Sequence, residues 1–96
     1  MATETRPWDV TEHLDSPEAI AAYLEAVFED GDPALIYAAL GDVARAKGMT
    51  SIAKETGLSR ESLYRALSAE GHPEFATIMK VLSALGLRLT AEPIAA

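Results

Sequence analysis

The sequence predicts an all-α fold, made of about five short helices that pack as one domain. Apolar residues recur at helical spacing along the chain, and Pro and Gly residues divide it into short segments. The chain has 96 residues, and 49% of them are hydrophobic, so it can bury one small core. Because only three residues are Phe or Trp, we expect close helix packing rather than a bulky aromatic interior.

Residues 1–15 are polar and mixed, and we expect them to form an N-terminal arm ahead of a single helical domain at residues 16–96. Apolar and charged residues alternate loosely in this arm, which favours a short strand near Asp9–Thr11. Trp8 is interpreted as an apolar anchor for the arm rather than as a platform for a ligand.

Two helices are predicted to follow the arm. The first begins after Ser16, a good N-cap that is followed by Pro, and it ends at Gly31. The same pattern recurs at once, so the second helix begins after Asp32 and ends at Gly48. The apolar residues expected to face inward are Ile20, Leu24, Val27, Phe28, Leu35, Ile36, Leu40 and Val43.

Three more helices complete the predicted fold. Thr50 is expected to cap a third helix that ends at Gly57, and Ser59 to cap a fourth that runs to about Ser68. A fifth helix starts near residue 73 and has an apolar face made of Phe75, Ile78, Met79, Leu82 and Leu85. It stops at Gly86, and the alternation in residues 87–90 favours a short half-buried strand.

The third and fourth predicted helices have the spacing of a helix-turn-helix at residues 50–68. Ala53 supplies the small residue where the two helices cross, Gly57 permits the positive φ of the turn, and Leu58 fills the core beside it. The inward edge of the second helix consists of Leu63, Ala66 and Leu67. The alternative is a plain helical hairpin whose polar face is only solvated.

The opposite edge of the fourth helix carries polar side chains within an arc of about 140°. Arg side chains can contact guanine edges or phosphate, Tyr and Ser can donate to phosphate, and Glu can accept from cytosine. A helix with such a face fits the major groove of double-stranded DNA. The residues predicted to bind DNA are Thr50, Ser51, Lys54, Ser59, Arg60, Glu61, Tyr64, Arg65 and Ser68.

The formal net charge of −7 opposes binding to DNA, but the charge is unevenly placed. Residues 1–40 hold nine acids and one base, a net of −8, whereas residues 41–96 have a net of +1. Within residues 45–65 the net charge is +3. We therefore expect the basic segment to meet DNA and the acidic half to attract a basic protein. The alternative for the acidic half is a surface that only confers solubility.

Composition and motifs argue against several other classes of protein. Cys is absent, so disulfides and thiolate metal sites are excluded. His13 and His72 have no third ligand at metal spacing, and we expect neither a metal nor a cofactor. No HExxH pair or phosphate-cradling glycine loop is present, so we do not expect an enzyme. No apolar run approaches ~20 residues and no secretory signal is seen, which favours a cytoplasmic protein without a membrane span.

The chain also resembles a known family. The helix-turn-helix stretch resembles that of the lambda-repressor-like (Xre/Cro) group, and residues 8–90 resemble the HigA-like addiction-module antidote proteins. The segments that carry this resemblance are Ala39–Met49, Gly57–Tyr64, Gly71–Pro73 and Ala84–Leu87, together with Tyr23-Leu24 and Gly31–Pro33. One departure is that Glu61 and Ser62 stand where many groove-reading helices carry Gln or Asn, which leaves the operator sequence and the affinity open.

The resemblance implies a type II antitoxin that binds operator DNA as a homodimer, represses its own operon and neutralises a RelE/HigB-type mRNA interferase toxin. The dimer contact is expected from residues 87–91, from the arm around Asp9 or from the fifth helix. Two alternatives stay open, namely a stand-alone Xre-type transcriptional regulator and a helical protein-interaction module that does not bind DNA.

Overall fold

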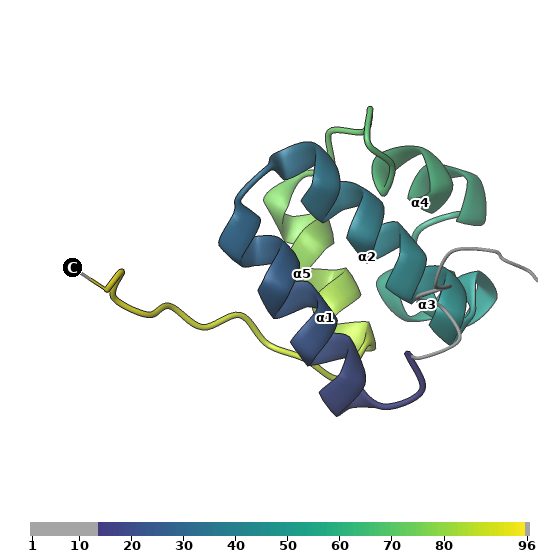
Figure 1. Ribbon diagram of the computed structural model, residues 1–96. Helices are drawn as coiled ribbons and strands as arrows, with labels where there is room; N and C mark the ends of the chain where they lie inside the picture. The colour runs from purple at the N-terminus through teal and green to yellow at the C-terminus, as the bar shows by residue number, and fades with distance from the viewer. Residues whose placement is uncertain (1–13, 96) are drawn as a thin grey trace, which may run out of the picture.

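The computed structural model describes residues 14–95, and this part of the chain folds into five α-helices without a strand (Figure 1). The predicted all-α fold is therefore confirmed. The helices are α1 (Pro17–Asp30), α2 (Pro33–Lys47), α3 (Met49–Thr56), α4 (Arg60–Ala66) and α5 (Phe75–Ala84). Residues 1–13 lie outside the described part of the chain. The predictions made for Trp8, for His13 and for a strand near Asp9–Thr11 therefore lie outside it as well.

α1 and α2 form a hairpin whose ends follow the predicted pattern. The Ser16 hydroxyl accepts a hydrogen bond from the backbone N–H of Ala19 at 3.1 Å, and the Asp32 carboxylate accepts one from Ala34 at 3.0 Å. Each cap is followed by Pro at the first helical position. Gly31 adopts a left-handed conformation (φ +80°), which ends α1 and lets the chain reverse into α2.

α2 is the central helix, because it contacts α1, α3 and α4 (Figure 1). α5 lies behind the α1–α2 hairpin in this view and contacts α3. The fully buried side chains of the core come from every helix, and they are Leu24, Leu40, Val43, Ile52, Leu63, Val81 and Leu85. Leu14, which was assigned to the arm, is also buried and packs into this core.

Two glycines allow parts of the chain to approach α4 closely. A Cβ atom at Gly41, in the middle of α2, would overlap the carbonyl oxygen of Leu67. A Cβ atom at Gly71, in the loop after α4, would overlap the carbonyl of Ala66 and lie 2.6 Å from that of Arg65. Because both contacts are with backbone atoms, neither can be relieved by turning a side chain. The absence of side chains at these positions therefore sets how closely α2 and the loop pack against the end of α4.

A polar cluster joins α1 to α2 on the partly exposed side of the hairpin. The Tyr23 hydroxyl donates a hydrogen bond to the Asp42 carboxylate at 3.2 Å, and the same carboxylate forms an ion pair with Arg45. Burial of the ring raises the pKa of Tyr23 above its ordinary value, and the charge of Asp42 and the hydrogen bond add to this effect. The hydroxyl therefore remains a neutral donor, and it links the two helices through one carboxylate.

The structure corrects the predicted inner faces. Phe28, Leu35, Phe75 and Met79 were expected to face inward, but all four are exposed, Phe75 to 66%. Phe28 is in the last turn of α1, while Leu35 and Phe75 are in the first turns of their helices, beyond the packed middle of the bundle. The buried face of α5 is centred further round the helix, on Val81, which is fully buried and was not among the residues predicted to face inward.

The predicted strand after the fifth helix is also wrong. Residues 87–95 are extended but have no strand pairing within the described part of the chain, and only Leu87 packs against the core. Alternation of apolar and polar residues indicates a half-buried strand only where a neighbouring strand satisfies its backbone groups. Of the described helices, none is long and apolar enough to cross a lipid bilayer.

Gly41→Ala tests the close approach of α2 to α4. Ala raises helix propensity by about 1 kcal/mol, but the overlap of its Cβ with the Leu67 carbonyl acts in the opposite direction and should dominate. We expect a net loss of about 1–3 kcal/mol in the free energy of unfolding, measured in urea. Ser83→Ala, at an exposed position of α5, is the control and should change stability by less than about 0.5 kcal/mol. Unchanged or increased stability of Gly41→Ala would show that the two segments can separate at no cost.

Candidate nucleic-acid interface

The candidate interface is built on α3 and α4, which follow one another after a three-residue connection and contact each other. Gly57 adopts a left-handed conformation (φ +78°) and donates its N–H to the carbonyl of Ala53 at 2.9 Å, which ends α3. The Thr56 hydroxyl donates to the same carbonyl at 3.3 Å and accepts from Leu58 N–H at 3.4 Å. Leu58 then packs against the core, as expected for the residue after the turn.

The start of α3 differs from the prediction. Thr50 was expected to be the N-cap, but it lies inside the helix, which begins at Met49 with Gly48 in the cap position. Gly48 has φ +118°, and no side chain caps the first turn of α3. Since the first N–H groups of a helix have no partner within it, those of α3 point out of the helix without a side-chain acceptor. Thr50 is exposed beside them and Ser51 is half-buried.

α4 begins at Arg60, and Ser59 is its N-cap, as predicted. The Ser59 hydroxyl accepts a hydrogen bond from Ser62 N–H at 3.0 Å and lies 2.9 Å from the Ser62 hydroxyl. The apolar edge of α4 faces inward, with Leu63 fully buried and Leu67, directly after the helix, 2% exposed. These two anchors fix which side of α4 is turned to solvent.

The predicted outward edge of α4 is exposed at Arg60, Glu61, Tyr64 and Arg65. The Arg60 guanidinium lies over the ring of Tyr64, with its carbon 5.9 Å from the ring centroid, at the outer limit of a cation–π contact. This contact holds two of the four side chains together on the surface. Lys54, on the preceding helix, is exposed as well.

Two of the predicted contact residues are engaged within the protein. Ser59 has its hydroxyl in the cap of α4, and Ser68 lies beyond the end of the helix, where its hydroxyl donates to the Arg65 carbonyl at 3.0 Å. α4 ends at Ala66, earlier than predicted, because Leu67 leaves helical geometry with ψ +58° as the chain turns towards Gly71. These two hydroxyls therefore stabilise the ends of α4.

Sequence reasoning missed a small pocket at the C-terminal end of α4. It is lined by polar side chains from the helix and from the loop after it, among them Ser62, Arg65, Ser68 and His72. Only the loop conformation, which depends on Gly71, brings His72 beside α4, so helical spacing gave no indication of it. In residues 14–95, no group of His, Asp and Glu is arranged to hold a metal ion.

Comparison with known proteins adds to this geometry. A family model described as "Probable addiction module antidote protein" matches residues 4–93. A protein of Haemophilus influenzae (strain ATCC 51907 / DSM 11121 / KW20 / Rd), itself named only as an uncharacterized protein, is 49% identical over 88 residues. That alignment covers 92% of this chain and 91% of the relative. No solved structure matches the chain.

Ser59→Ala tests how α4 is anchored. Loss of the cap leaves the Ser62 N–H without its acceptor, so we expect the free energy of unfolding to fall by about 0.5–2 kcal/mol. Thr50→Ala is the matched control, because Thr50 makes no capping bond, and it should leave stability within about 0.5 kcal/mol of the unchanged protein. Thermal or urea unfolding measures both variants. Equal effects of the two substitutions would contradict the assignment of Ser59 as the cap.

Proposed function

The chain belongs to the family of probable addiction module antidote proteins, and from this we propose that it is a type II antitoxin that represses its own operon. An antidote of an addiction module has a toxin as its partner. We infer that this toxin is a RelE/HigB-type mRNA interferase, and that the antidote neutralises it by direct binding. We also infer that the chain is a cytoplasmic regulator without catalytic activity and binds its operator through a helix-turn-helix formed by α3 and α4.

The exposed edge of α4 is the observation that carries the DNA-binding proposal. Arg60, Tyr64 and Arg65 are exposed, while Leu63 on the same helix is fully buried. Arg60 is at the first position of the helix, and in helix-turn-helix proteins the N-terminal residues of the recognition helix contact base edges. We therefore assign base contacts to Arg60, whereas Arg65, at the far end of the helix, is assigned to phosphate or to a flanking base.

The start of α3 supports the same orientation. Its uncapped N–H groups, with Thr50 and Lys54 exposed on the same short helix, form a donor-rich surface beside α4. Helix N-termini bind phosphate through such N–H groups and through the helix dipole. In this arrangement α3 crosses the DNA backbone while α4 lies in the major groove.

A homodimer is part of the proposal, because operator binding by this motif requires two recognition helices about 34 Å apart. The exposed apolar side chains of α5 are suited to the contact between the two copies. Phe75 and Met79 are 66% and 42% exposed, and a surface of this kind is stabilised when a second copy covers it. The extended residues after α5 are a further candidate for this contact.

One observation favours a second candidate function. The net charge of −7 disfavours association with DNA, so a helical protein-interaction module that has lost DNA binding remains an alternative. A stand-alone Xre-type regulator without a toxin is the other alternative. The experiments below separate these two from the proposed antitoxin.

Arg60→Ala tests the assignment of α4 to the major groove. We expect discrimination between the upstream operator and unrelated DNA to fall by ~1–3 kcal/mol, because a base contact is lost. Gel shifts over a series of salt concentrations measure this, with Lys80→Ala on α5 as the control that removes an equal charge. An equal loss of affinity for all DNA, with the salt slope reduced by about one, would reassign Arg60 to phosphate. Binding like that of the unchanged protein by both Arg60→Ala and Arg65→Ala would contradict the role of α4.

A second test concerns the toxin. The product of the small reading frame next to this gene should co-purify with the chain, and an equimolar amount of the chain should abolish its cleavage of mRNA. Cleavage of a labelled transcript, with and without the antidote, provides the measurement. A neighbour that does not bind the chain would favour the stand-alone regulator, and a neighbour that binds but does not cleave RNA would exclude the mRNA interferase assignment.

A further inference from the structure

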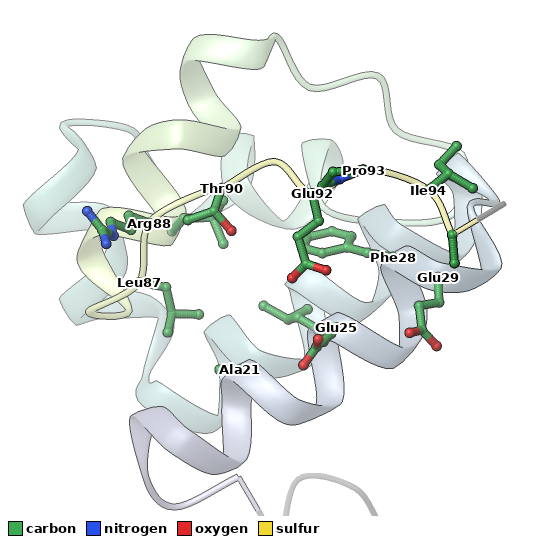
Figure 2. Close-up of a pocket in the computed structure, with 13 residues that line it drawn as sticks. Ala21, Glu25, Phe28, Glu29, Leu87, Arg88, Thr90, Glu92, Pro93 and Ile94 are labelled. Carbon is green, nitrogen blue, oxygen red and sulfur yellow. The ribbon is translucent and has the colours of Figure 1, made fainter.

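A groove runs between α1 and the extended tail at residues 87–95 (Figure 2). Its floor is apolar, and it includes the buried Leu24 of α1 and Leu82 of α5. Phe28 stands in its wall and is 37% exposed, while Leu87 and Ile94 line it from the tail. The exposed apolar side chains of this mixed lining, Phe28 among them, are favourable for a partner that can cover them.

The groove is bordered by carboxylates. Glu25 and Glu29 project from successive turns of α1, and Glu92 projects from the tail above Phe28 (Figure 2). Among the described residues that line the groove, Arg88 is the one base. α1 itself carries four acids and no Lys or Arg, so its field extends this negative charge along the whole helix.

Few interactions fix the tail at residues 88–95 beside the groove. The last hydrogen bond between described backbone groups runs from Leu87 N–H to the carbonyl of Leu82 at 2.9 Å. Ile94 is 95% exposed, although it lies beside an apolar groove. The tail is therefore free to adjust its backbone and its apolar side chains to a segment that enters the groove.

We propose that this groove is the docking site for a basic amphipathic segment of the cognate toxin, an inference that rests on the proposed antitoxin function. The apolar side of such a segment covers Phe28 and Leu87, and its Lys or Arg residues pair with Glu25, Glu29 and Glu92. A second copy of this chain is disfavoured as the occupant, because its own acidic groove would bring like charges together.

The groove and the candidate DNA interface lie on different parts of the molecule. α2 separates α1 from α4, and the tail leaves the bundle on the side of α1 (Figure 1). A toxin segment in the groove therefore leaves Arg60 and Arg65 exposed. One chain can bind toxin and operator at the same time, and toxin should add to the operator complex rather than displace it.

Charge reversal tests the proposal on the full-length chain with the purified toxin. E25K/E29K should weaken toxin binding roughly tenfold or more in calorimetry, because two attractive contacts become repulsive. E70K/E74K is the matched control, since it makes the same change in net charge at two exposed residues of the α4–α5 loop that do not line the groove. The control should bind toxin within about twofold of the unchanged protein.

Two further measurements separate a local effect from loss of fold. Phe28→Ala, which leaves the charges intact, should also weaken toxin binding, while operator binding in gel shifts should persist in every variant. Toxin added to the operator complex should give a band of lower mobility.

The outcomes distinguish this inference from the proposed function. If the unchanged chain does not bind toxin, both are overturned. If it binds toxin but E25K/E29K binds as tightly, the groove inference is overturned and the antitoxin function stands. If E25K/E29K and E70K/E74K weaken toxin binding equally, the loss is due to net charge alone, and the groove inference is overturned. A change in the sedimentation of the free chain on E25K/E29K substitution, with toxin affinity unchanged, would assign the groove to a second copy.

Discussion

The rest of the structure depends on the close contact between the backbone of α2 and the end of α4. Gly41 allows α2 to pack directly against the Leu67 carbonyl, and Gly71 allows the following loop to fold back against Ala66. With these contacts in place, Leu63 enters the core and the opposite edge of α4 has to face solvent. Arg60 and Arg65 are therefore exposed because the backbone of α2 and of the loop packs against the inner side of α4. No contact made by a surface residue is needed to orient the helix.

The same central helix divides the molecule into two regions of different charge. On one side are α3 and α4, with Lys54, Arg60 and Arg65 exposed, and on the other is α1, with four acids and no base. This separation reconciles a net charge of −7 with a proposed role at DNA, because electrostatic attraction acts through local potential and is screened beyond about 10 Å at moderate salt. Under the proposed function the two partners, operator DNA and a basic toxin, have opposite charges and are assigned to separate surfaces of the fold.

Much of this fold was predictable because its boundaries have local causes. Ser16, Asp32 and Ser59 cap their helices as expected, and Gly31 and Gly57 adopt the left-handed conformations that end them. The errors occur where tertiary contacts decide the outcome. Phe75 has the spacing of an inward residue but lies beyond the packed part of α5, and residues 87–90 alternate like a strand without a strand to pair with. The exposed edge of α4 was deduced from helical periodicity, whereas the groove beside α1 depends on where the tail runs.

The contact between Arg60 and Tyr64 has a consequence for the entropy of recognition. A free arginine samples many rotamers, and fixing them on binding costs roughly 0.5–1.5 kcal/mol. A guanidinium that rests on the ring, even at the outer limit of a cation–π contact, has fewer rotamers left to fix on binding. Through this contact Tyr64 lowers the entropic cost of a complex made by Arg60 even when the tyrosine hydroxyl itself touches nothing.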